Sequence, residues 1–292
     1  MSEHNVEKDD ISGVETTGHD WDGIKELNNP APRWWLMVFY VCIAFAIGYW
    51  VIYPAWPTFS GDNERGGTKG TMGWTEYKQL KDSQAEILAR RAQYLGRFEK
   101  ASFSQIENDE GLRDFAVAGG KAAFKDNCAT CHGTGGAGGN GYPNLNDDDW
   151  LWGGKIEDIY QTIRFGIRSG DDEARLSEMP TFGGMLTPKQ ISDVADFVLS
   201  KDNPTTPTAI EGKQVFADNC ASCHGEKATG GREVGAPDLV DAIWLYGGTK
   251  ADIMAQVTKP RHGVMPAWEH RLDRNTIREL AVYVHSLGGG EE

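Results

Sequence analysis

The chain is poor in cysteine and in basic residues. Its 292 residues include five cysteines, and 29 lysines and arginines stand against 43 aspartates and glutamates, so the net charge is −14. This balance argues against nucleic acid as a partner. Four of the cysteines belong to the motifs described below, which leaves Cys42 without a partner and predicts no disulfide framework. The length is sufficient for about two domains.

Long apolar stretches are also scarce, and one stands out. The segment from Trp34 to Tyr53 carries no charge and has aromatic residues at both ends, as expected at membrane interfaces. About 20 apolar residues suffice to cross ~30 Å of hydrocarbon, and Pro54 and Pro57 would then end the helix. A long polar segment precedes it and no small-residue cleavage site follows, which argues against a signal peptide. We therefore predict a transmembrane anchor over residues 34–55, with Cys42 as one of its small apolar residues.

Four cysteines form two Cys-x-x-Cys-His motifs, Cys128 to His132 and Cys220 to His224. In a helical turn, residues at i, i+3 and i+4 lie on one face, so both thiols can bond to one porphyrin edge while the imidazole reaches the iron. This pattern is the attachment motif of c-type haem, and the added histidine argues against a redox dithiol or a zinc site. We predict two haem c groups, bound covalently by Cys128, Cys131, Cys220 and Cys223, with His132 and His224 as proximal iron ligands.

The motifs belong to an internal repeat with a period of about 90 residues. Pro143–Leu145 resembles Pro237–Leu239, and Trp150–Gly154 resembles Trp244–Gly248. We expect Trp150, Trp152, Trp244 and Tyr246 to pack on the haem or to hydrogen-bond a propionate. Buried aromatics that merely line a small core are the alternative.

Each copy ends in an amphipathic helix, predicted over Thr187–Ser200 and Asp273–Leu287, with an N-capping residue at its first position. A linker over residues 202–208 contains prolines that disfavour a continuous helix. The sequence thus predicts a mainly α chain with tandem haem domains at 111–202 and 203–292. Each domain is small for an independent core, so we expect the haem to serve as the core.

The sixth iron ligands are predicted from a second duplicated feature, the Met-Pro step. Met179 and Met265 each precede a proline and a closing helix. Thioether ligation raises the potential of a haem relative to bis-histidine ligation. Met185 is the rival in the first copy, and Met254 and His262 are rivals in the second. Because both irons would be saturated, we expect the chain to carry electrons and not to be an enzyme itself.

Attachment of c-type haem takes place outside the bacterial cytoplasm, and this sets the predicted orientation. Residues 1–33 would be a cytoplasmic tail, and residues 56–110 a periplasmic spacer that is partly helical. Within the spacer, the segment Met72–Ser102 has apolar residues among charges and is predicted to be helical. It would pack against the first haem domain or a partner subunit, or else be a solvated spacer.

The two haem units resemble class I cytochrome c domains. The leader Gly18–Pro30, the following Pro32–Trp35 and the segment Tyr53–Pro57 are similar to those of the dihaem subunits (subunit III, the P subunit) of cbb3-type cytochrome c oxidases. The resemblance spans leader, anchor, spacer and haem domains in order. Some members of that family have two membrane helices, whereas this sequence predicts one.

The resemblance implies a place in a respiratory complex of the bacterial inner membrane. The chain would accept electrons from a periplasmic donor cytochrome c and pass them to a monohaem cytochrome c subunit. From there they would reach the catalytic haem–copper subunit, which reduces oxygen to water and pumps protons. The second domain is expected to meet the donor. The alternatives are a free-standing membrane-anchored dihaem shuttle and a dihaem peroxidase, and the paired Met-Pro steps argue against the peroxidase.

Overall fold

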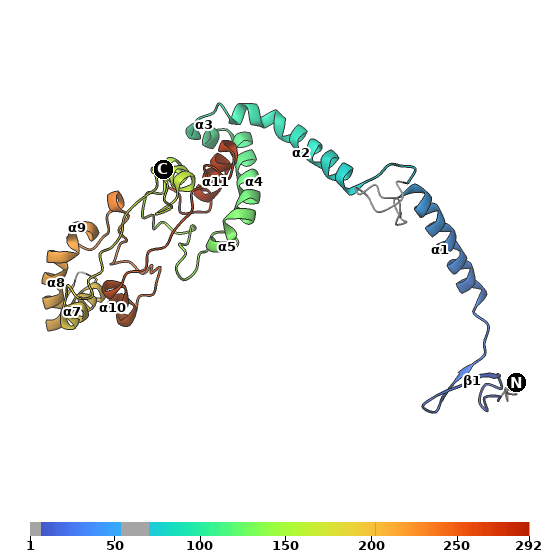
Figure 1. Ribbon diagram of the computed structural model, residues 1–292. Coiled ribbons are helices and arrows are strands. Elements are labelled where there is room, and N and C mark those ends of the chain that lie inside the picture. Colours follow the sequence, from blue (N-terminus) through green and yellow to red (C-terminus); the bar gives the residue numbers. More distant parts are fainter. Residues whose placement is uncertain (1–6, 54–69, 202, 292) are drawn as a thin grey trace. The chain divides into compact units, whose positions relative to one another are not determined.

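The computed structural model describes residues 7–53, 70–201 and 203–291. The chain divides into an N-terminal unit that ends at Arg90 and a C-terminal unit that begins at Arg91 (Figure 1). The described part is mainly α-helical, as predicted, with one two-stranded sheet. Pro54, Pro57 and Asp202, which figured in the predictions for the anchor and the linker, lie outside the described residues.

The N-terminal unit begins with a hairpin that the sequence analysis missed. Strand β1 (Thr16–Trp21) pairs antiparallel with β2 (Ile24–Leu27). Asp22 and Gly23 form the turn at φ values of 59° and 90°, and the Gly23 amide donates to the Asp20 carboxylate at 2.6 Å. Positive φ at both turn residues is the type I′ geometry that an Asp-Gly pair favours, so this dipeptide was the signal for the hairpin.

Helix α1 (Arg33–Ile52) confirms the predicted apolar helix to within one residue at each end. Its mean hydropathy is 2.2, and none of its side chains is buried. Of the helices in residues 7–53, 70–201 and 203–291, it alone is long and apolar enough to cross a membrane. An apolar helix whose side chains are not buried in protein needs another apolar environment, which a bilayer supplies.

The spacer helix is also present, as α2 (Glu76–Phe98), and is followed by α3 (Phe103–Asn108). Most of α2 is exposed, including Tyr77, Leu80 and Leu88, but Phe98 is fully buried. Phe98 packs with residues from α3, from α4 (Glu110–Asn127) and from α11 (Arg274–His285). The C-terminal end of α2 therefore packs within the C-terminal unit, as one predicted alternative has it, whereas the rest of the helix is exposed, as expected of a solvated spacer.

The rest of the C-terminal unit is helical and follows the repeat. The short helices α5 (Ala129–His132) and α9 (Ala221–His224) carry the two motifs. The remaining elements of this unit are α6 (Ile156–Phe165), α7 (Pro188–Leu199), α8 (Pro207–Asn219), the 3-10 turn η1 (Arg232–Val234) and α10 (Lys250–Thr258). Helices α7 and α11 are the predicted closing helices. Both predicted caps are confirmed: Thr187 accepts from the Gln190 amide, and Asp273 accepts from the amides of Asn275 and Thr276.

The closing helices are exchanged between the two copies of the repeat. Helix α11 ends the second copy but packs against α4 and α6 of the first, and α7 ends the first copy but packs against α8 and α10 of the second. In Figure 1 the dark red α11 accordingly lies beside the green α4, and the olive α7 beside the orange α8. Neither folded core is therefore built from one contiguous copy of the repeat.

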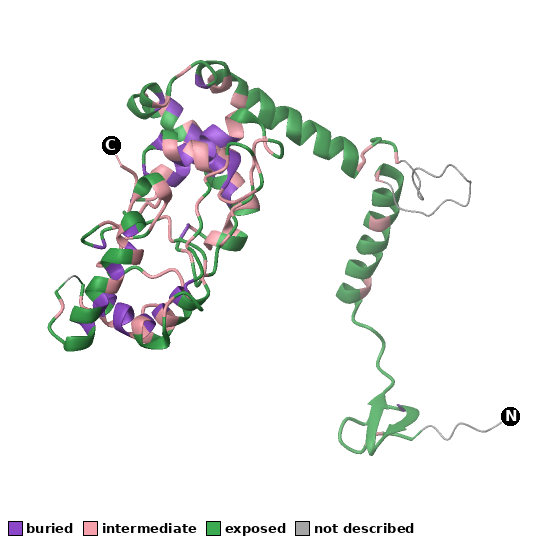
Figure 2. Cartoon of the chain, turned by 60° about the vertical axis from the view of Figure 1, so that its left-hand side comes forward, coloured by how far each residue is buried: buried purple, intermediate pink, exposed green. Residues whose placement is uncertain are grey.

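Besides the cluster around Phe98, two cores lie beside the motifs, and we name each after its motif. The first-motif core comprises Phe124, Ile156, Ile159, Ile163, Ile277, Leu280, Ala281, Tyr283 and Val284. The second-motif core comprises Phe182, Ile191, Val194, Ala195, Phe197, Val198, Phe216, Cys220, Ala228, Ile253 and Val257. Figure 2 shows these buried residues gathered in the C-terminal unit, whereas the N-terminal unit is almost wholly exposed.

Equivalent glycines let the exchanged helices approach closely. A Cβ atom on Gly120 of α4 would come within 3.0 Å of the Glu279 backbone and of Tyr283 in α11. A Cβ atom on Gly212 of α8 would come equally close to the Asp193 backbone in α7. A glycine within a helix destabilises it by about 0.5–1 kcal/mol relative to alanine. The close helix crossing that glycine permits explains its presence at both positions.

Candidate haem sites

The two motifs form the same turn in each copy. Helix α5 begins directly after Cys128, whose amide donates to the Phe124 carbonyl at 2.8 Å, and α9 begins after Cys220 with the same bond to Phe216. Each turn places its two cysteines and its histidine on one face. The four thiols form no disulfides. Burial raises the pKa of the Cys128 and Cys220 thiols to about 11.

Both histidines are held with one ring nitrogen occupied and the other available. His132 Nδ1 lies 3.2 Å from the Pro143 carbonyl oxygen, and His224 Nδ1 lies 3.1 Å from that of Pro237. A carbonyl only accepts, so Nδ1 must carry the hydrogen and Nε2 keeps its lone pair. Burial lowers the pKa of both imidazoles and favours the neutral form. A neutral imidazole whose Nδ1 is fixed by a carbonyl is the usual state of a metal-ligating histidine.

The predicted methionine ligands lie in opposite cores from those that their sequence positions suggest. Met265 packs against the first-motif core, together with Cys128 and Ala129. Met179 packs against the second-motif core, which contains Cys220. The sequence does not decide whether either methionine ligates the haem of its own copy, and in the structure each methionine packs with the core beside the motif of the other copy.

The rival ligands differ in their surroundings. Met185 is 69% exposed and His262 is also exposed, so neither is held against a core. Met254 lies on α10 and packs against the second-motif core. It is therefore the one rival that shares a core with a motif.

The predicted aromatic residues occupy two kinds of position. Trp244 packs against the second-motif core, and Trp150 packs against the first-motif core while its Nε1 donates to the Gly289 carbonyl. Trp152 lies against Gly235, and Tyr246 lies against Gly141, so each ring contacts the other copy of the repeat. Their predicted contact with haem remains a prediction.

An arginine near Trp152 has an unused donor. The Arg175 guanidinium lies over the Trp152 ring at 5.6 Å, and one of its terminal nitrogens donates to Asp158 at 3.1 Å. Its Nε is buried and, among the described residues, is the side-chain nitrogen left without a hydrogen-bond partner. Such a donor calls for an acceptor. A haem carries two propionate carboxylates, so this orphan fits a haem bound nearby.

Carboxylates from both copies of the repeat gather at one place, which the sequence analysis did not single out. Burial, and then repulsion from Asp241 and Asp147, raises the pKa of Asp149 to about 6. Burial raises the pKa values of Asp147 and Asp241 as well. The run Asp147-Asp148-Asp149 was the available signal, but nothing in the sequence placed it near Asp241, because that proximity depends on the tertiary fold.

Family models match three successive parts of the chain. Residues 13–60 match the N-terminal domain of cytochrome oxidase-cbb3, FixP; residues 117–202 match cytochrome c; and residues 207–284 match cytochrome c oxidase, cbb3-type, subunit III. The second and third matches contain the two Cys-x-x-Cys-His turns described above. The chain belongs to the family of cbb3-type cytochrome c oxidase subunits FixP and CcoP.

Full-length relatives support the same family. The chain is 53% identical over 297 residues to the cbb3-type cytochrome c oxidase subunit FixP of Sinorhizobium medicae, with 100% of both chains covered. It is 49% identical to the FixP subunit of Bradyrhizobium sp., again with 100% of both covered. It is 49% identical to the CcoP subunit of Azospirillum brasilense, with 98% of this chain and 99% of the relative covered.

Membership in this family establishes the broad role. The chain is a cytochrome c subunit of a cbb3-type oxidase complex, binds c-type haem and takes part in electron transport with other subunits of that complex. Helix α1 and the family together indicate a single-pass protein of the inner membrane. This agrees with the prediction of one membrane helix.

Proposed function

We propose that the chain relays electrons through two covalently attached haem c groups, one at Cys128 to His132 and one at Cys220 to His224. Electrons enter from a periplasmic donor cytochrome c and leave to the monohaem cytochrome subunit. They then reach the catalytic haem–copper subunit, where oxygen is reduced to water and protons are pumped. His132, His224, Met179 and Met265 would hold the two irons, and with every iron position so filled the chain would transfer electrons without binding a substrate of its own.

The observation that carries this proposal is the duplicated histidine geometry. His132 and His224 make the same Nδ1 hydrogen bond to the carbonyl of a proline that follows the motif. These hydrogen bonds fix the orientation of both imidazoles and leave Nε2 of each available to an iron. When bound, the haem supplies the redox chemistry, and the protein orients it and tunes its potential.

The proposed orientation puts the hairpin in the cytoplasm and the C-terminal unit in the periplasm. It rests on the covalent attachment of haem, which is completed outside the bacterial cytoplasm. Protease added to spheroplasts should digest the C-terminal unit and leave the segment before α1 protected. Protection of the C-terminal unit instead would reject this orientation.

The relay is tested by purifying the chain from membranes in mild detergent. The affinity tag belongs at the N-terminus, because the other end is packed: the Glu291 amide donates to the Gly154 carbonyl at 2.9 Å. A monohaem cytochrome c, b-type haem and cyanide-sensitive oxygen uptake should copurify. Recovery of the chain alone with two low-spin haems would favour a free-standing shuttle.

Saturation of both irons has a separate test. Carbon monoxide added to the reduced, isolated chain should leave its spectrum unchanged, because no coordination position is open. A carbon monoxide adduct or a high-spin signal would indicate an open iron and would revive the peroxidase alternative. The double variant Cys220→Ala, Cys223→Ala serves as the control for haem content and should retain one covalent haem.

A further inference from the structure

We propose that Arg175 binds a propionate group of the haem attached at the second motif, and that Arg261 has the equivalent role at the haem of the first motif. This inference rests on the proposed attachment of one haem c at each motif. It names two side chains outside the Cys-x-x-Cys-His turns, and it gives each of them the task of fixing a haem carboxylate and raising the potential of that haem.

The two arginines stand at the same place in the repeat. Arg175 precedes Met179 by four residues, and Arg261 precedes Met265 by four residues. Both therefore lie just before a Met-Pro step. A cation at the same position of two repeated units is expected where each unit binds the same anion, and a haem brings two propionate carboxylates to each motif.

The Arg175 side chain has an aromatic neighbour and an acidic neighbour. Its guanidinium lies over the Trp152 ring, 5.6 Å from the ring centroid, and one terminal nitrogen donates to the Asp158 carboxylate at 3.1 Å. The Arg175 amide donates to the Gly166 carbonyl at 3.0 Å, and the Arg168 amide donates to the Arg175 carbonyl at 2.9 Å. Backbone and side chain are thus both fixed beside the end of α6.

The remaining donor of Arg175 points to a ligand. Its Nε is buried and, in the part of the chain that the structure describes, has no hydrogen-bond partner. A buried N–H group without an acceptor is costly, and a propionate oxygen at Nε would form a charge-assisted hydrogen bond. The five N–H donors of a guanidinium suffice for two anions, so Asp158 and a propionate can bind Arg175 together.

Trp152 indicates which haem Arg175 would serve. A Cβ atom on Gly235 would come within 3.0 Å of the Trp152 ring, so the ring lies against the loop between His224 and Pro237. His224 Nδ1 donates to the Pro237 carbonyl, and this loop therefore orients the second-motif histidine. The guanidinium that lies over Trp152 is accordingly assigned to the haem of the second motif.

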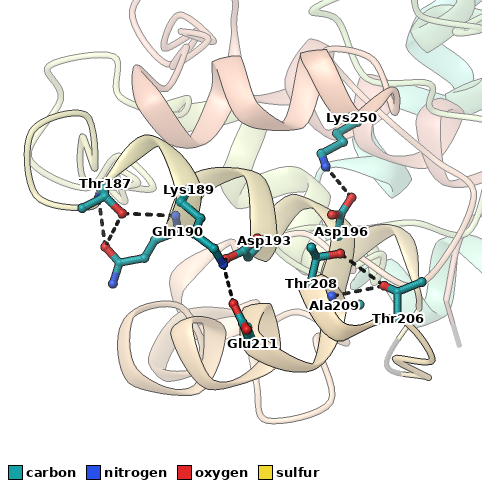
Figure 3. Close-up of polar contacts among 10 residues, drawn as sticks. All are labelled: Thr187, Lys189, Gln190, Asp193, Asp196, Thr206, Thr208, Ala209, Glu211 and Lys250. Carbon is teal, nitrogen blue, oxygen red and sulfur yellow. Dashed lines mark hydrogen bonds and ion pairs between the residues drawn. The ribbon is translucent and has the colours of Figure 1, made fainter.

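The segment that follows the arginine is fixed to the second copy by ion pairs. Figure 3 shows Lys189 of α7 between Asp193 and Glu211, the latter from α8. Lys250 of α10 pairs with Asp196 of α7 at 2.6 Å. These pairs join α7 to two helices of the second copy, and they favour the same assignment because the arginine shortly precedes α7 in the chain.

The second arginine has matching surroundings in the other copy. A Cβ atom on Gly141 would meet the Tyr246 ring at 3.4 Å, and Gly141 belongs to the loop that ends at Pro143, whose carbonyl holds the first-motif histidine. Arg261 lies over the Tyr246 ring at 4.4 Å and donates to the Tyr246 carbonyl at 3.0 Å. Unlike its counterpart, Arg261 is exposed, so solvent screens its charge and we expect a weaker effect.

The charge of Arg175 gives this contact a measurable consequence. Oxidation of a haem adds one positive charge, and a fixed cation nearby opposes that change. Arg175→Gln removes the cation and keeps a planar amide, so the midpoint potential of the second haem should fall. We expect the equilibrium between the ferrous and ferric forms to shift by roughly tenfold, which is about 59 mV for one electron.

The test is a redox titration of the full-length holoprotein in which the second haem is marked. Cys220→Ala leaves a single thioether at the second motif, so one vinyl group stays conjugated and that haem absorbs at longer wavelength. Added to the marked chain, Arg175→Gln should lower the potential of the marked haem. Arg261→Gln should lower only the potential of the unmarked haem, and by less. Arg175→Lys should retain most of the potential of the marked haem, because the charge remains.

A control variant separates a specific contact from a change in net charge. Arg113 is an exposed arginine of α4 that donates to the Glu107 carbonyl at 3.2 Å. Arg113→Gln removes the same charge and should leave both potentials unchanged. The inference is overturned if Arg175→Gln leaves the marked haem unchanged, if it lowers only the unmarked haem, or if Arg113→Gln lowers the marked haem equally.

A measurement on the unsubstituted protein covers the case in which the variants do not mature. A cryo-electron-microscopy structure of the chain within its oxidase complex should place Arg175 Nε about 2.7–2.9 Å from a propionate oxygen of the second haem. A water molecule or a protein oxygen at Nε, with both propionates elsewhere, would reject the inference. Haem staining separates the two levels: a chain without two covalent haems contradicts the proposed function, whereas two haems without an Arg175–propionate contact contradict only this inference.

Discussion

Arg91 donates a hydrogen bond of 2.6 Å to the carboxylate of Glu279, although 188 positions separate the two residues in the chain. Glu279 is 1% exposed and Arg91 is 35% exposed. The pair joins the C-terminal end of α2 to the last helix of the chain. A buried carboxylate is costly without a partner, so this contact favours the packing of α11 on the first copy of the repeat.

Arg91→Ala should destabilise the C-terminal unit by about 2 kcal/mol, because Glu279 loses its charged hydrogen-bond partner inside the protein. Thermal unfolding of the detergent-solubilised protein, followed by circular dichroism, measures the effect. Arg90→Ala is the matched control, since Arg90 pairs with Glu86 at the surface and such pairs contribute about 0.5 kcal/mol or less. Equal effects of the two substitutions would contradict this account.

The penalty for Arg91→Ala should also depend on pH. Burial raises the pKa of Glu279, and Arg91 opposes that rise, so removing Arg91 raises the pKa further. When the pKa of a carboxyl group is higher in the folded state than in the unfolded state, where it is about 4.3, the folded protein loses stability as the pH rises from the unfolded to the folded pKa. The variant should therefore be closest to wild type near pH 4, and adding Glu279→Gln should restore much of the loss at pH 7.

Local elements were predictable from the sequence because their signals are local. The apolar run predicted α1 to within a residue, and the capping residues Thr187 and Asp273 predicted where α7 and α11 begin. The cysteine motifs predicted the turns of α5 and α9 in the same way. The predicted domain boundaries at 111–202 and 203–292 describe the two copies of the sequence repeat and remain a prediction. Each folded core, in contrast, takes helices from both copies.

The exchange of closing helices was not predictable, because the two helices have equivalent apolar faces. Either α7 or α11 presents a suitable stripe to either α4 or α8, and sequence order favours the nearer partner. The selective groups are Arg278 and Glu279, whose partners lie about 180 residues away in the region of α2. In the sequence, the signal for this exchange was the presence of charged Arg278 and Glu279 in the predicted closing helix, and a charged side chain by itself does not identify its partner.

Arg278 should hold the end of α2 against the C-terminal unit. Arg278→Met keeps the apolar stem but removes the donors to the carbonyls of Phe98 and Glu99, now 2.8 and 3.2 Å away. We expect a loss of about 1–3 kcal/mol, since buried acceptors are left without donors. Limited proteolysis should then cut between α2 and α3 at an increased rate. Arg274→Met, on an exposed residue of the same helix, should leave the cleavage pattern unchanged.

The crossing of α4 with α11 should not tolerate a side chain at Gly120. Gly120→Ala places a Cβ atom within 3.0 Å of the Glu279 backbone and of Tyr283, so the helices must move apart. We expect destabilisation of about 1–3 kcal/mol from overpacking, reduced by the better helix propensity of alanine. Gly212→Ala should have a similar effect on the second-motif core.

A matched control for this prediction lies in the same helix. A Cβ atom on Gly111 would meet its neighbours at 3.4 Å, which is ordinary contact. Gly111→Ala should therefore be neutral or stabilise α4 by up to about 1 kcal/mol. If Gly111→Ala and Gly120→Ala shift the melting temperature alike, the close crossing of α4 and α11 is wrong.

Asp149 should make the stability of the C-terminal unit fall between about pH 4 and pH 6. Burial and the neighbouring carboxylates raise its pKa to about 6, above the usual value of about 3.9. The folded state then binds the proton more tightly than the unfolded state, so ionisation on raising the pH costs stability. The melting temperature measured from pH 4 to pH 8 should decline across this window and level off above it.

Asp149→Asn should remove that decline, because an amide does not ionise. Asp149 is only partly buried, so solvent screens the repulsion and the gain at pH 7 should be about 1 kcal/mol. Below about pH 4 the variant and the wild type should be equally stable, since the carboxyl is protonated there. Asp148→Asn removes the same charge from an exposed neighbour and should keep the slope of the wild type. If Asp148→Asn abolished the decline of the melting temperature with pH and Asp149→Asn preserved it, the decline would not arise from the ionisation of Asp149.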